Sequence, residues 1–177
     1  NTIMKPLNKI LFTLVSIICL FGTTSCLKDD PIIDWGNIKY VIEMPYKSHY
    51  ILKQKVAVGT DITLDLMVNY TINDVKHVKE SIPVDLGIDE SLVAAYNSGL
   101  SSSTKKYILL PASTYNLPKQ ATIEKGTRLW SGTFSVKTST LKKGEKYLLP
   151  IKITNVPSGY TISGNFGHLY IRIDMAK

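Results

Sequence analysis

The chain has 177 residues, of which 44% are hydrophobic and 9% aromatic, and it carries 21 Lys and Arg against 14 Asp and Glu. This length is sufficient for one domain with its own hydrophobic core. The basic residues behind the formal net charge of +7 are scattered, without the clustered charge and stacking aromatics of a nucleic-acid groove. We therefore predict no nucleic-acid partner.

The first predicted element is an export signal. Lys5 and Lys9 precede an apolar run from Ile10 to Phe21, and a secretory signal has this plan. The run is too short for a spanning helix, which needs about 20 apolar residues. Small residues stand at 23–25, directly before Cys26, so we expect cleavage after residue 25.

The end of this signal resembles a bacterial lipobox, in which a cysteine is alkylated with diacylglycerol and becomes the first residue of the mature chain. Cys26 occupies that position here. Lys28, Asp29 and Asp30 follow and resemble the surface-export tag of Bacteroidetes lipoproteins, although a solvated, charged start to a tether would look the same. We expect a lipid anchor in the outer membrane and display at the cell surface, with periplasmic retention as the alternative.

Cleavage divides the chain into a signal peptide at 1–25, a lipidated tether at 26–37 and a folded domain at 38–177. The 152 residues that remain carry a formal charge of +5, because Lys5 and Lys9 are removed. Both cysteines, Cys19 and Cys26, lie in or at the end of the signal. The folded body therefore has no disulfide, thiolate metal site or cysteine nucleophile.

Alternating apolar and polar residues predict β-strands along the rest of the chain. The clearest strand runs from Ile62 to Ile72, where Met67 is the sole apolar residue on the polar side. Pro150 lacks a backbone donor, which predicts an edge or bulged strand around it. The other predicted strands are 38–43, 50–58, 84–88, 107–110, 121–124, 129–137, 147–154 and 169–174.

One short helix is predicted after residue 88. Asp89 caps it, Leu92, Ala95 and Tyr96 form its apolar face, and Asn97-Ser98-Gly99 ends it. A Lys125-Gly126 turn predicts a hairpin between strands 121–124 and 129–137. Short strands separated by turn residues at a spacing of about 8 to 12 residues are typical of a β-sandwich. The predicted fold is thus an all-β, antiparallel sandwich with one short helix.

Four stretches of the chain carry a family resemblance. They are VDLGIDESLVAAYN at 84–97, YILLPASTYNL at 107–117, IEKGT at 123–127 and LKKGEKYLLPIKITN at 141–155. Their order resembles the domain of unknown function 1735 family, an immunoglobulin-like β-sandwich of Bacteroidetes lipoproteins. The resemblance implies a non-catalytic N-terminal module of the kind found in surface lipoproteins, including glycan-degrading and glycan-binding ones.

The chain shows no pattern that predicts catalysis, a cofactor or a metal. His49, His77 and His168 lack the spacing of a metal motif. Glycoside hydrolysis needs two acids that face each other across a cleft, and Asp61 and Asp65, which flank a strand, do not predict such a pair. Because no nucleophile-elbow pattern is present either, we predict that the chain is not an enzyme.

Aromatic residues are the remaining candidates for ligand binding. Exposed Trp and Tyr rings stack on the apolar faces of sugar rings, and Trp35, Tyr46 and Tyr50 lie near the tether and an early loop. Trp130 is the fourth candidate, although it shares its phase with Phe134, which favours a place in the core.

We therefore predict a non-catalytic, lipid-anchored surface module. Its partner is a polysaccharide or an envelope protein of an outer-membrane carbohydrate-uptake or adhesion system. The alternative is a purely structural β-sandwich that acts as a spacer or an assembly subunit of the envelope.

Overall fold

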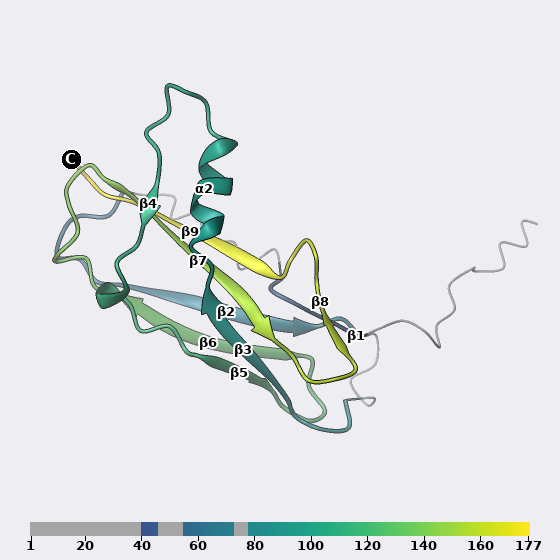
Figure 1. The fold of residues 1–177 in the computed structure, drawn as a ribbon. Coiled ribbons are helices and arrows are strands. Elements are labelled where there is room, and N and C mark those ends of the chain that lie inside the picture. Colours follow the sequence, from purple (N-terminus) through teal and green to yellow (C-terminus); the bar gives the residue numbers. More distant parts are fainter. Residues whose placement is uncertain (1–39, 46–54, 73–77) are drawn as a thin grey trace, which may run out of the picture. The chain divides into compact units, whose positions relative to one another are not determined.

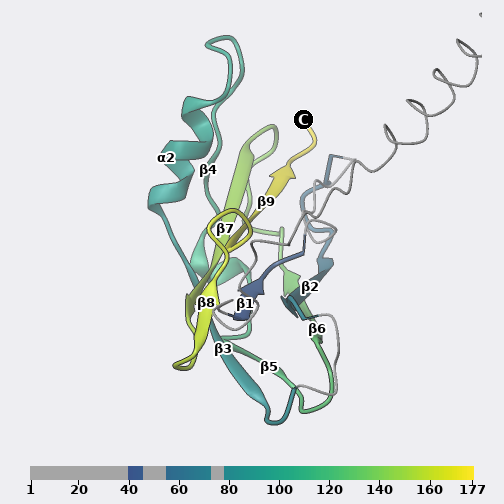
Figure 2. The same cartoon turned by 90° about the vertical axis from the view of Figure 1, so that its right-hand side faces the viewer.

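The computed structural model describes residues 40–45, 55–72 and 78–177, which belong to one compact unit, Lys39–Lys177. Two β-sheets make up most of this unit, and they form a sandwich (Figure 1). In the turned view of Figure 2, strands β2 and β6 of one sheet lie to the right of strands β3 and β7 of the other. The predicted all-β sandwich with a short helix is confirmed.

The first sheet, sheet A, has the strand order β6-β2-β1-β8. Strand β2 pairs antiparallel with both β1 and β6, whereas β8 runs parallel to β1. Strand β2 has the predicted start and ends two residues before the predicted end. The strands are β1 (Tyr40–Glu43), β2 (Ile62–Tyr70), β6 (Leu129–Val136) and β8 (Tyr160–Ile162).

The second sheet, sheet B, is built around β7. Strands β3 and β9 pair antiparallel with β7, β5 pairs antiparallel with β3, and the short β4 runs parallel to β7. The two parallel pairs make both sheets mixed, which residue alternation does not reveal, because it is the same in both directions. The strands are β3 (Ile82–Ile88), β4 (Ile108–Leu109), β5 (Gln120–Ile123), β7 (Lys146–Asn155) and β9 (His168–Asp174).

The core lies between the two sheets and follows the period of two. In β2 the buried residues are Leu64, Leu66, Val68 and Tyr70, and the residues between them are exposed or half-buried. In β9 the inward residues Leu169, Ile171 and Ile173 are fully buried. Removal of this apolar surface from water is the main term that holds the two sheets together.

The predicted hairpin between 121–124 and 129–137 is wrong. Strand β5 pairs with β3 and β6 pairs with β2, so the turn between them carries the chain from sheet B to sheet A. Gly126 has a φ of +75°, as a tight turn requires. Strands β5 and β6 both point apolar residues inward, and this pattern fits facing sheets as well as a hairpin.

Of the two alternatives predicted for the strand around Pro150, the edge strand is wrong and the bulged strand is confirmed, because the register of β7 against β3 shifts between the partners of Asp85 and Leu86. Strand β7 has neighbours on both sides, and Pro150 lies opposite Tyr170 of β9. On the other side its carbonyl accepts a hydrogen bond from the Asp89 amide at 3.1 Å. At Pro150 the neighbouring strand β4 has already ended, and β3 pairs with β7 only as far as Ile151. The N–H group that proline lacks would therefore have no partner in the regular ladder.

The helix α2 (Ser91–Ser98) starts one residue later than predicted, with Glu90 at the N-cap. Asp89 precedes this residue, and its carboxylate accepts hydrogen bonds from the backbone amide and the hydroxyl of Ser91 in the first turn, as a capping side chain does. The predicted apolar face is wrong at Ala95, which is exposed, whereas Tyr96 is half-buried. A helix that packs on one side of a sheet buries only a narrow stripe. A 3-10 turn, η3 (Ala112–Thr114), follows β4.

Part of the predicted strand at 50–58 lies outside the described residues. Of the described part, Val56 forms an isolated parallel bridge with Met175, just beyond β9. In the ranges that the structure covers, no helix is long and apolar enough to cross a membrane.

Candidate functional site

Most of the residues singled out from the sequence lie outside the described ranges. These are the lipidation residue Cys26, the tag residues Lys28, Asp29 and Asp30, and the aromatic candidates Trp35, Tyr46 and Tyr50. Of the predicted site residues, the structure therefore places Trp130.

Trp130 lies on the inner side of β6. It is opposite Val68 of β2 and shares its face with the buried Phe134, and its half-buried ring packs against the core. The indole ring lies over Gly132, and a Cβ atom on this glycine would be only 2.5 Å from the ring. The absence of a side chain at Gly132 therefore makes room for the indole. The position of Trp130 is thus that of a core residue near the start of a strand.

Three tyrosines that the sequence analysis did not single out gather on neighbouring strands of sheet A. Tyr40 of β1, Tyr70 of β2 and Tyr160 of β8 form what we call the tyrosine rim. The Tyr70 ring meets the rings of Tyr40 and Tyr160 edge-on, with centroids 5.5 Å and 5.7 Å away. The Tyr40 and Tyr160 rings are 6.1 Å apart and tilted by 40°. The rim therefore presents adjacent aromatic rings from three strands.

Burial differs sharply within the tyrosine rim. Tyr70 is 2% exposed and Tyr160 is half-buried, whereas Tyr40 is 49% exposed. Burial, with the neighbouring phenols of Tyr40 and Tyr160, raises the pKa of Tyr70 to about 12. Burial also raises the pKa of Tyr160, with contributions from Glu80 and Tyr40. Tyr70 and Tyr160 are thus neutral hydrogen-bonding groups at physiological pH.

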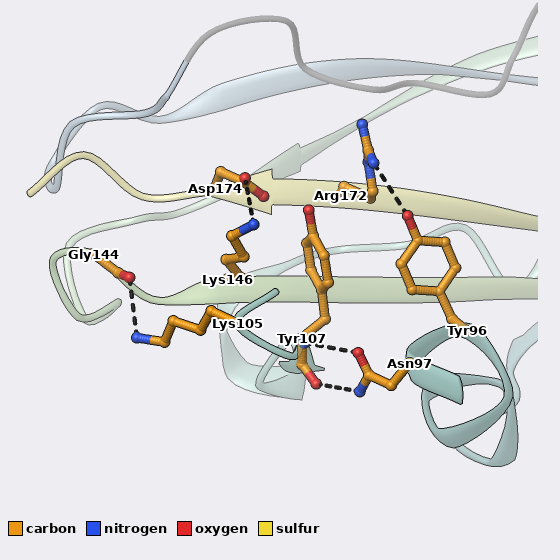
Figure 3. A network of polar contacts seen from close by, with 8 residues as sticks. All are labelled: Tyr96, Asn97, Lys105, Tyr107, Gly144, Lys146, Arg172 and Asp174. Carbon is orange, nitrogen blue, oxygen red and sulfur yellow. Dashed lines mark hydrogen bonds and ion pairs between the residues drawn. The ribbon is translucent and has the colours of Figure 1, made fainter. Parts of the chain in front are cut away.

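A second tyrosine cluster lies on the outer face of sheet B (Figure 3). The Tyr96 ring of α2 packs edge-on against Tyr107 with centroids 5.5 Å apart, and against Tyr170 of β9 at 4.9 Å. The Tyr96 hydroxyl accepts a hydrogen bond from the Arg172 guanidinium at 3.2 Å. These contacts fasten the helix to the sheet.

Charged groups complete this second cluster. The Lys146 ammonium lies 5.2 Å from the centre of the Tyr107 ring and 3.6 Å from a carboxylate oxygen of Asp174. Burial, helped by the hydrogen bond and charge of Asp174, raises the pKa of Tyr107 to about 12. Tyr107 is 5% exposed, so little of its ring is accessible to a ligand. The second cluster is therefore mainly a packing device.

The outer face of sheet A carries two open hollows. The larger, of about 480 Å³, is lined by residues that include Met67, Asn69 and Leu129, and also by Tyr70 of the tyrosine rim. The smaller, of about 290 Å³, also touches Met67 and is otherwise polar. The outward Met67, the apparent exception in the β2 pattern, thus links both hollows. The aromatic residue that lines the larger hollow is the buried Tyr70.

The geometry does not assemble a catalytic pair from the acids near α2. The Asp85 carboxylate accepts hydrogen bonds from Gln120 and Asn155, at 2.8 Å and 3.1 Å, and these bonds lower its pKa. Hydrogen bonds from Ser91 and Lys152 lower the pKa of Asp89. Both acids are therefore charged and occupied at neutral pH. Among residues 40–45, 55–72 and 78–177, no three His, Cys, Asp or Glu side chains gather as metal ligands.

Fold and surface together define a β-sandwich module with an exposed tyrosine among its described residues. Residues 38–159 match the model of a family described as an N-terminal domain. Because this match covers more than half of the chain, the chain belongs to that family of N-terminal domains. No curated protein matches the sequence.

Several solved structures share the fold. A putative carbohydrate binding protein from Bacteroides ovatus aligns with a TM-score of 0.54 and 19% identity, over 70% of this chain and 35% of its own. A multidomain protein including DUF1735 from Bacteroides ovatus aligns with a TM-score of 0.53 and 12% identity, over 75% and 44%. EndoBT-3987 of Bacteroides thetaiotamicron, solved with a Man5GlcNAc product, aligns with a TM-score of 0.51 and 14% identity, over 75% and 30%. The chain thus spans less than half the length of these proteins.

Proposed function

We propose that the chain is a non-catalytic, glycan-binding module of the DUF1735 type, held in the outer membrane by a lipid on Cys26. The observation that carries the proposal is the match of residues 38–159 to a family of N-terminal domains. Such a domain accompanies other domains in larger proteins, and the chain spans only part of its structural neighbours.

Two features support glycan as the ligand class. The neighbours include a putative carbohydrate binding protein and a protein solved with Man5GlcNAc. The described surface also offers an exposed tyrosine at Tyr40, and such a ring stacks on the apolar face of a sugar. The carboxylates of Asp85 and Asp89 are engaged in hydrogen bonds within the protein, which supports glycan binding without hydrolysis.

A glycan array with the protein produced without residues 1–25 tests this function. We expect selective binding of a small set of glycans, with no change in their mass on prolonged incubation. Turnover of any glycan by the pure protein would contradict the non-catalytic assignment. Absence of glycan binding, together with recovery of one stoichiometric envelope protein in a pull-down, would favour the structural alternative.

A further inference from the structure

We propose that the tyrosine rim, Tyr40 with Tyr70 and Tyr160, is the subsite at which this module stacks a neutral sugar ring, with Tyr40 as the platform. This inference rests on the proposed glycan-binding function and adds to it the position of the site and the charge of the ligand.

The exposure of Tyr40 is the first argument. Three large hydrophobic residues among those described are more than a third exposed, namely Tyr40 at 49%, Ile108 at 47% and Leu129 at 44%. Of these, Tyr40 has an aromatic ring. An exposed tyrosine combines a large apolar ring face with a polar hydroxyl group. It therefore suits a contact in which the ligand covers the ring and the hydroxyl group forms hydrogen bonds.

The support beneath Tyr40 is the second argument. Its ring meets the buried Tyr70 ring edge-on at 5.5 Å, and it lies beside Tyr160, which is paired with it in the parallel β1–β8 ladder. Both neighbours sit on strands, where side chains are held more precisely than on loops. Tyr40 therefore loses little conformational freedom when a ligand stacks on it.

The hydrogen-bonding groups around the rim are the third argument. Tyr40, which is 49% exposed, and the half-buried Tyr160 each contribute a phenol, which both donates and accepts, as sugar hydroxyl groups do, whereas the buried Tyr70 only supports their rings. Neutral phenols match an uncharged ligand. The ligand class that suits these uncharged phenols is a neutral hexose or hexosamine unit, despite the basic net charge of the whole chain.

Isothermal titration with the full 177-residue chain in detergent tests the inference. The probes are neutral oligosaccharides of glucose, galactose, mannose and N-acetylglucosamine, with polygalacturonate as the acidic comparison. For the tightest neutral probe we expect Tyr40→Ala to weaken binding about tenfold, which corresponds to about 1.4 kcal/mol. Tyr40→Phe keeps the ring and should stay within about threefold of the unchanged protein.

Matched variants separate the rim from the rest of the surface. Ile108→Ala removes an equally exposed apolar side chain from sheet B and should leave the affinity unchanged. Thr133→Ala alters the smaller hollow, which no residue of the tyrosine rim lines, and should do the same. Polygalacturonate should bind more weakly than the tightest neutral probe. Melting curves establish that each variant is folded.

The outcomes distinguish the two proposals. If the protein binds a neutral probe and Tyr40→Ala binds equally well, the rim assignment fails while the glycan-binding function stands. Loss of binding in Thr133→Ala instead would move the site to the smaller hollow and also overturn the rim. If the unchanged protein binds none of the probes, both proposals fail.

Discussion

At the residue scale, Gly167 has no room for a side chain. A Cβ at this position would be 2.5 Å from the Ser163 carbonyl oxygen and 2.7 Å from a methyl group of Ile162. The Gly167 carbonyl also accepts a hydrogen bond from Ile153 of β7 at 2.9 Å. We expect Gly167→Ala to lower the free energy of unfolding by about 2 kcal/mol in urea titrations, because backbone has to move.

Gly164 of the same loop is the matched control. Nothing lies within 4 Å of a Cβ built there, so Gly164→Ala should change stability by less than about 0.5 kcal/mol. Equal effects of the two substitutions would contradict the close approach at Gly167.

Two buried phenols predict a loss of stability in alkali. Folding raises the pKa of Tyr70 and of Tyr107 from 10.0 to about 12. The folded state then holds more protons than the unfolded state between these values, so the free energy of unfolding falls as the pH rises from 10 towards 12. Below pH 10 this contribution to stability is fully present.

Urea titrations at several pH values measure this effect. Tyr70→Phe removes one of the two ionising groups and should make the decline above pH 10 shallower. An unaltered slope in this variant would show that Tyr70 ionises as readily in the folded state as in the unfolded state.

The aromatic residues show how far the site could be predicted from residues alone. The period of two correctly gave Trp130 the same phase as Phe134. In the structure, Tyr40 shares its face of β1 with the buried Ile42. Tyr40 is nevertheless exposed, because β2 ends at Tyr70, the partner of Ile42, and so has no residue opposite Tyr40 at the start of β1. Sequence alternation defines the face of a strand but not where its neighbours stop.

At the element scale, Asn97 holds the segment after α2 in place. Its side-chain amide donates to the Tyr107 carbonyl and its side-chain oxygen accepts from the Tyr107 amide, both at 2.8 Å (Figure 3). We expect Asn97→Ala to cost about 2 kcal/mol, because two partly buried backbone groups lose their partner. Hydrogen exchange at the Tyr107 amide should accelerate more than exchange in β7.

Ser98→Ala is the control for this variant. The Ser98 hydroxyl makes an exposed bond to Ala95, one turn back along α2, and alanine favours helices, so this change should leave stability nearly unaltered. Unchanged protection of the Tyr107 amide in Asn97→Ala would mean that the aromatic contacts of Tyr96 suffice to hold the segment.

Strand existence was easier to predict from the sequence than strand partnership. The alternating apolar residues predict β2, β3, β6 and β9 within a few residues, because each has one face that is more buried than the other. Strand pairing depends on long-range packing, which the alternation of residues does not reveal. The sequence therefore predicts a hairpin at Gly126, where the chain instead passes from sheet B to sheet A. Strand β8, with three half-buried residues, has too little alternation to be predicted.

At the scale of the whole molecule, the predicted anchor has its own test. Lys28, Asp29 and Asp30 follow the lipidation residue and resemble a surface-export tag. We expect a triple alanine variant of these residues to be protected from protease added to intact cells, whereas the unchanged protein is digested. Equal protection of both proteins would contradict surface display.

Cys26→Ala provides the control for anchoring itself. Mass spectrometry of the unchanged protein should find an acylated mature terminus at Cys26, and this substitution should abolish the fatty acid. A leader that remains attached to the unchanged protein would contradict both the signal peptide and the anchor.

The pairing of β9 with β7 bears on how this module is to be cut from a longer polypeptide. The family match ends at residue 159, ahead of both β8 and β9. A recombinant fragment that stops there lacks the strand that pairs with β7 from Lys146 to Lys152, and it uncovers the buried residues opposite it. The end of the family match is therefore not the end of the folded domain, and a recombinant fragment should extend at least to Met175.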